Sequence, residues 1–85
     1  MSVHKAITKH VEQVNNRVHH FKQLDHLREH YIEEAVQQCL NGEIFSVQKI
    51  NEVTEEINVL AKQGVIPSRK VVTAEMVKEY ALKLN

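Results

Sequence analysis

The sequence has few of the residues that break helices, cross-link chains or cradle phosphates. It contains two Gly, one Pro, one Cys and no Trp, and its 11 Lys and Arg balance 11 Asp and Glu, for a formal net charge of zero. A single Cys excludes an internal disulfide framework, and two Gly leave almost no room for a glycine-rich phosphate loop. A net charge of zero gives no overall field that would recruit nucleic acid or anionic lipid.

Long hydrophobic runs are also missing. No stretch approaches the roughly 20 apolar residues of a membrane-spanning helix, and the first residues lack the apolar run of a secretory signal. We therefore expect a cytoplasmic protein with no membrane partner. The length predicts a single domain, residues 1–85, of a size at which a lone core is only marginally stabilising.

What the sequence does have is a long stretch without Gly or Pro, from Val3 to Leu40. Apolar residues recur along its first half at steps of three and four, at Val3, Ile7, Val11, Val14, Val18 and Phe21. This spacing predicts one amphipathic helix over about residues 3–41, with Gly42 as the left-handed residue that ends it. Asp25 and Arg28 interrupt the apolar rhythm, and any bend belongs near them.

An unbroken helix of this length would be about 57 Å long at 1.5 Å per residue. A compact chain of this size has a radius of gyration near ~12 Å, so it cannot enclose such a rod. With no breaker residue in the stretch, we favour the continuous helix and expect a second copy of the chain to cover its apolar side. The predicted interface residues are Ile7, Val11, Val14, Val18 and Phe21.

Two shorter helices are predicted in the second half of the chain. Ser46 is a suitable N-cap for a helix over about 47–63, which Gly64 ends. Thr73 is a suitable N-cap for a helix over about 74–84. The fold class is therefore all-α, with both shorter helices packed back along the first and the bundle completed by dimerisation.

Six His is a high count for this length, and three of them share a row on the first helix. His26 and His30, four residues apart, could chelate a divalent metal, with Glu33 as a third ligand. This row lies opposite the apolar stripe, however, so these side chains should face water. We expect no metal and no cofactor, and we keep His-mediated metal binding as a third alternative.

Residues 46–84 offer a different functional alternative. A helix, a connector with Pro67, Arg69 and Lys70, and a further helix have the outline of a helix-turn-helix. The two cations could supply about two phosphate contacts, whereas a committed DNA-binding protein makes about six to ten. We therefore rank nucleic-acid binding second and do not expect it.

Three stretches carry a family resemblance: Met1–Ile7, His30–Ala35, and Pro67–Thr73 continuing to Tyr80. With them, the whole chain resembles a family of small uncharacterised helical proteins from Bacillus-type bacteria, classed as a domain of unknown function. The resemblance implies a bacterial cytoplasmic protein, and it assigns no activity and no functional residue.

No arrangement of nucleophile, base and acid can be picked out of the sequence. We therefore expect no enzymatic activity and no catalytic residue. The leading hypothesis is a non-enzymatic protein–protein interaction or regulatory module that acts through apolar helix faces. Its expected partners are a second copy of the chain and a protein that the residues do not identify.

Overall fold

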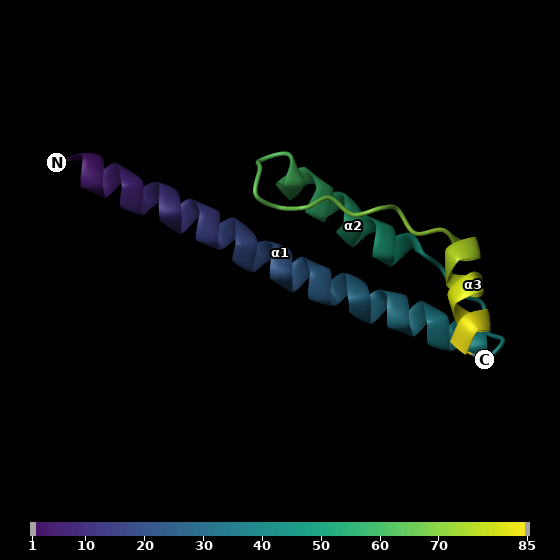
Figure 1. Cartoon of the computed structure of the whole chain (residues 1–85). Helices are drawn as coiled ribbons and strands as arrows, with labels where there is room; N and C mark the ends of the chain where they lie inside the picture. Colours follow the sequence, from purple (N-terminus) through teal and green to yellow (C-terminus); the bar gives the residue numbers. More distant parts are fainter. Residues whose placement is uncertain (1, 85) are drawn as a thin grey trace.

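A computed structural model describes the backbone of residues 2–84 and the side chains of residues 8–84. Its longest element is α1, Ser2–Leu40, which runs without a break and confirms the predicted continuous helix (Figure 1). Gly42 ends it at φ +73°. The amide of Glu43 donates to the carbonyl of Gln38 at 2.9 Å, and that of Gly42 donates to Cys39 at 3.1 Å. These two bonds form a Schellman motif, which satisfies carbonyls that a helix end would otherwise leave unpaired.

The two shorter helices are α2, Gln48–Ala61, and α3, Ala74–Leu84. The bounds of α3 agree with the prediction, and the Thr73 hydroxyl accepts a hydrogen bond from the amide of Met76 at 3.2 Å, as an N-cap should. α2 is shorter than predicted, because it begins one residue later and ends at Ala61. The N-cap is Val47 and not the predicted Ser46, whose hydroxyl accepts a hydrogen bond from the amide of Gln48 at 3.1 Å.

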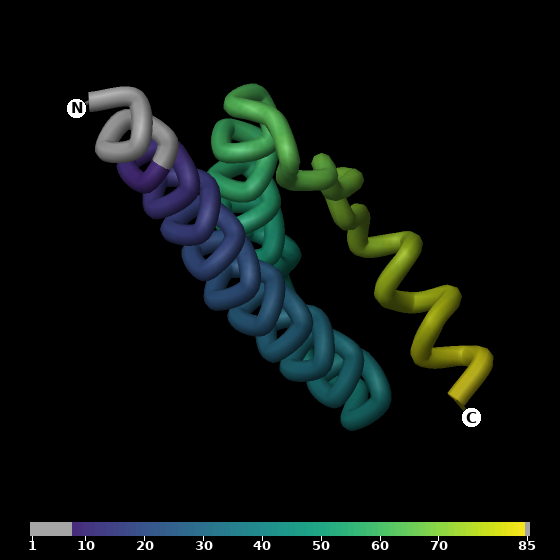
Figure 2. The backbone as a smooth tube through the Cα atoms, turned by 60° about the vertical axis from the view of Figure 1, so that its left-hand side comes forward, coloured from purple at the N-terminus to yellow at the C-terminus, as the bar shows by residue number. Residues whose placement is uncertain are grey.

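The chain doubles back twice after α1. α2 runs antiparallel to the second half of α1, and residues 62–73 then turn and run extended beside α2 (Figures 1 and 2). The turn uses Gly64 at φ +90° and, unexpectedly for a β-branched residue, Val65 at φ +62°. α3 lies against the last turns of α1, so both shorter helices contact α1, as predicted.

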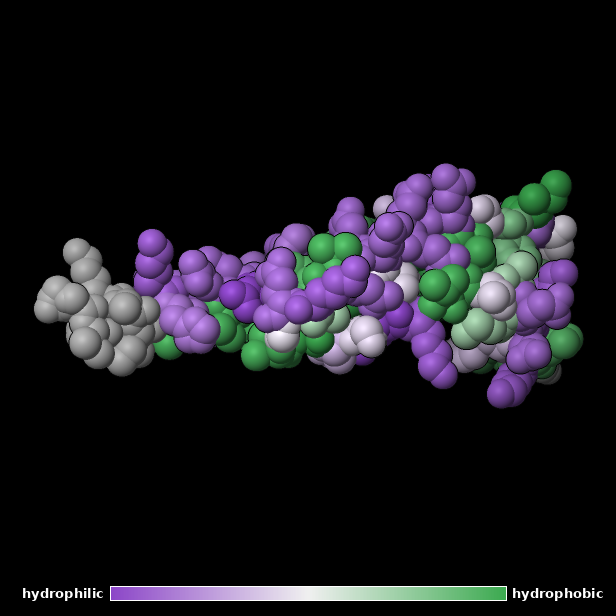
Figure 3. All heavy atoms as spheres, turned by 90° about the horizontal axis from the view of Figure 1, so that it is seen from above, coloured by the Kyte–Doolittle hydropathy of each residue, from purple (hydrophilic) through white to green (hydrophobic). Residues whose placement is uncertain are grey.

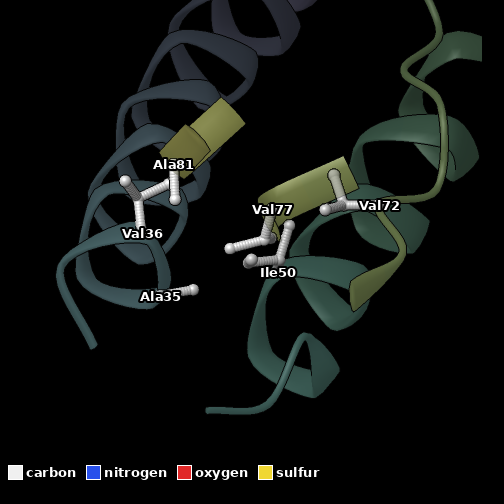
Figure 4. Close-up of a cluster of buried hydrophobic side chains, with 6 residues drawn as sticks. All are labelled: Ala35, Val36, Ile50, Val72, Val77 and Ala81. Atoms are coloured by element: carbon white, nitrogen blue, oxygen red, sulfur yellow. The ribbon is translucent and has the colours of Figure 1, made fainter. Parts of the chain in front are cut away.

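The two core clusters of the described residues lie along the second half of α1. One cluster joins α1, α2, α3 and the extended segment, and Figure 4 shows its members: Ala35, Val36, Ile50, Val72, Val77 and Ala81. A second cluster joins α1 to α2 through Leu24, Val53 and Ile57. Leu24 is the first buried residue of α1, and none of the described side chains before it is buried. The first half of α1 therefore extends beyond the core.

This arrangement makes the molecule long and tapered. Its extents are 62 × 19 × 16 Å and its radius of gyration is 17.3 Å, whereas a compact chain of this length would have about 12 Å. Seen from above in Figure 3, the coloured part of the molecule is narrower toward the start of α1 and broader toward the end where α3 lies. None of the described helices is long and apolar enough to cross a membrane.

Candidate interaction surface

The first half of α1 carries an apolar row that its own chain leaves partly open. Val11, Val14 and Val18 follow one another at steps of three and four, and we call them the N-terminal stripe. Val11 is 49% exposed, and the other two are partly exposed. The Arg17 guanidinium donates to the carbonyl of Gln63, just after the end of α2, at 3.3 Å. Val11 and Val14 therefore lie before this contact along α1, and Val18 lies directly after it.

The other two predicted interface residues differ from the stripe. Phe21 packs against the second core cluster, and the guanidinium carbon of Arg69 lies 5.2 Å from the centre of its ring. Its own chain therefore covers Phe21 in large part. The side chain of Ile7 lies outside the described residues. Ile7 therefore stays a prediction, and the surface considered further is formed by Val11, Val14 and Val18.

An extended segment, residues 65–73, lies along α2, and we call it the strap. Two asparagines of α2, seven residues apart, hold its backbone. Asn58 donates to the carbonyl of Arg69 at 2.9 Å and accepts from its amide at 2.7 Å. Asn51 makes the same pair of bonds with Val72, both at 2.8 Å. Each side-chain amide thus replaces the backbone partner that a neighbouring strand would supply.

Arg28 fixes the strap from the side of α1. Its Nε donates to the Thr54 hydroxyl at 2.8 Å, and its Nη2 donates to the carbonyl of Lys70 at 2.9 Å. Burial lowers the pKa of Arg28 below its ordinary value, and the charge of Asp25 opposes this shift. Because arginine stays protonated in proteins, the guanidinium is held as a cation, and these hydrogen bonds offset its loss of hydration.

Arg69, one of the two proposed nucleic-acid contacts, is engaged inside the chain. Its Nε lies 3.1 Å from Asp25 Oδ1, and its Nη2 lies 3.5 Å from Asp25 Oδ2. Lys70 has an exposed side chain. The connection between α2 and α3, residues 62–73, is also far longer than the three- to four-residue turn of a helix-turn-helix. The geometry therefore does not favour the nucleic-acid alternative.

The proposed metal ligands lie on the surface of α1. His26, His30 and Glu33 are all exposed. Among the residues that the structure describes, no group of three His, Cys, Asp or Glu side chains is placed to hold a metal ion. The row thus remains a set of solvated side chains in this arrangement, and it gives no geometric support to the third alternative.

The sequence did not indicate an open groove of about 600 Å³ between α1 and α3. We call it the α1–α3 groove, and its lining residues are Glu29, Ile32, Glu33, Val36, Gln37, Tyr80 and Leu84. Carboxylates from α1 stand beside apolar side chains from both helices. Tyr80 and Leu84 are 54% and 56% exposed, so α3 offers apolar surface beside the groove. Their spacing of four was the available signal, because it placed both residues on one face of α3.

These features define an elongated all-α chain of three helices, in which α1 has a core along one half and an open apolar row along the other. Residues 1–83 match the family described as "Protein of unknown function (DUF2533)", and the chain belongs to this family. It is 44% identical over 82 residues to "Uncharacterized protein YpbS" of Bacillus subtilis (strain 168), covering 96% of each chain. The predicted family resemblance is thereby confirmed. No solved structure matches the chain.

Proposed function

We propose that this chain is a non-enzymatic protein–protein interaction module and that the N-terminal stripe on α1 is its binding surface. One observation carries the proposal: the apolar spacing of α1 continues past the Arg17–Gln63 contact at the end of α2, through Val14 to Val11, which is 49% exposed. A helix that binds to another protein commonly does so through a row of apolar residues at this helical spacing. A partner would bury the row, and it would stabilise the first half of α1, which the core of this chain does not support.

The surface area of the chain is consistent with a missing partner. The accessible surface is 6409 Å². A compact protein of 9.9 kDa would expose about 5,200 Å². The excess, about 1,200 Å², is larger than the ~800 Å² that each partner contributes to a standard interface. An elongated chain exposes more surface than a compact one, and the stripe lies on the part of α1 before the two core clusters.

Photo-crosslinking in native cells tests this proposal. A photoreactive amino acid replaces Val11 in one variant and Asn16 in a matched control. Asn16 is also exposed but lies on the opposite face of α1. We expect protein adducts from position 11, either with a second copy or with another protein, and few from position 16. Equal adducts from both positions, or none from position 11, would contradict the proposal.

A further inference from the structure

We infer that the partner of the N-terminal stripe is a second copy of this chain, bound antiparallel, and that the stripe of each copy occupies the α1–α3 groove of the other. This inference rests on the proposed function, because it names the partner of that same surface. Two surfaces of one chain are involved, and a two-fold axis uses each of them twice.

The distribution of charge along α1 decides the orientation. Residues 1–24 have a formal net charge of +3, from Lys5, Lys9, Arg17 and Lys22 against Glu12. Residues 25–40 have a formal net charge of −3, from Asp25, Glu29, Glu33 and Glu34 against Arg28. An antiparallel pair places the positive half of each α1 beside the negative half of the other, whereas a parallel pair places like charges together.

The α1–α3 groove has the chemistry that the stripe requires. Ile32 and Val36 supply an apolar surface on α1, and Tyr80 and Leu84 supply one on α3. Glu29 and Glu33 stand in the same lining, where the basic half of a second α1 would meet them. A helix that presents apolar residues at steps of three and four fits between two such helices.

One register satisfies both copies at once. Placing residue 11 opposite residue 36 also places residue 18 opposite residue 29, so the two-fold axis crosses α1 between residues 23 and 24. The stripe then runs along the groove over its whole length. Lys22 of one copy comes within about one helical turn of Glu29 of the other. The two contacts, one on each side of the axis, together bury both copies' stripes.

Sedimentation of purified protein over micromolar to millimolar concentrations tests the inference. We expect the wild-type chain to form dimers. Val14→Asp in the stripe and Leu84→Asp in the groove should each weaken dimerisation roughly tenfold or more, because each carries a carboxylate into an apolar contact. The matched controls are Asn16→Asp on the far face of α1 and Leu82→Asp on α3. Both control positions are exposed, Leu82 by 72%, and both variants should dimerise as the wild type does.

Mixing the two variants tests the reciprocal geometry. A dimer of one variant carries a substitution in both of its stripe–groove contacts. A mixed dimer carries both substitutions in one of these contacts and has the wild-type residues in the other. The mixture should therefore associate more tightly than either variant alone. A wild-type monomer at all concentrations would overturn the inference, and so would a Leu84→Asp variant that dimerises normally. If crosslinking from Val11 nevertheless yields an adduct with a different protein, the proposed function stands while this inference fails.

Discussion

At the scale of single residues, the side chains that interrupt the apolar pattern hold the strap. Asp25 pairs with Arg69, and Arg28 binds both Thr54 and the carbonyl of Lys70. These polar groups replace apolar contacts where α1 meets an extended backbone instead of another helix. Such a backbone has amides and carbonyls that need partners when water is partly excluded. The interruption of the pattern is therefore explained by the strap and not by a bend.

Asn58 allows the contribution of one such side chain to be measured. Asn58→Ala removes a donor and an acceptor and leaves the amide and carbonyl of Arg69 without them. We expect the free energy of unfolding to fall by about 1–3 kcal/mol. Asn58→Asp should also destabilise, since a carboxylate can accept from the amide but cannot donate to the carbonyl. Urea denaturation followed by circular dichroism measures both, with exposed Glu56→Ala on the same helix as the control. An unchanged midpoint for Asn58→Ala would show that the strap does not depend on this pair of bonds.

At the scale of elements, α1 is one helix in two environments. Residues 24–40 are supported by the core, whereas residues 8–20 rely on their own hydrogen bonds and a few contacts near Arg17. Isolated helices of that length are marginal in water. In a dilute monomeric sample, we expect the amides of residues 8–20 to open at a cost of about 1 kcal/mol or less, while those of residues 24–40 stay protected.

Hydrogen exchange at two protein concentrations checks this difference between the halves of α1. Raising the concentration should protect residues 8–20 as dimers form and leave residues 24–40 nearly unchanged. The Val14→Asp variant should lose this gain. Uniform protection of α1 in the dilute sample would mean that the first half is stable without a partner.

The positions of helices could be predicted from the sequence because their ends carry local signals. Gly42 and Thr73 each act within a turn of the helix end that they cap, so pattern and structure agree there, whereas α2 ends at Ala61, before Gly64. The α1–α3 groove and the strap were not predicted. They depend on how segments far apart in the sequence meet, and the seven-residue spacing of Asn51 and Asn58 does not show which segment they bind. The prediction grouped Phe21 with the stripe because both share the same spacing. Spacing alone cannot show that Arg69, from a distant segment, lies over the Phe21 ring.

At the scale of the whole molecule, the length of α1 fixes the long dimension of one chain at 62 Å. The proposed dimer predicts how much longer than this the pair of chains is. With the two-fold axis between residues 23 and 24, the two α1 helices overlap almost completely. The dimer should then have twice the mass but a longest dimension of only about 70 Å, because the offset between the helices is about five residues at 1.5 Å each. Small-angle scattering measures mass and length on one sample. A combined Val14→Asp/Leu84→Asp chain should return the dimensions of the single copy. A length approaching twice that of one chain would instead indicate end-to-end association, in which the basic half of one α1 cannot lie along the acidic half of the other.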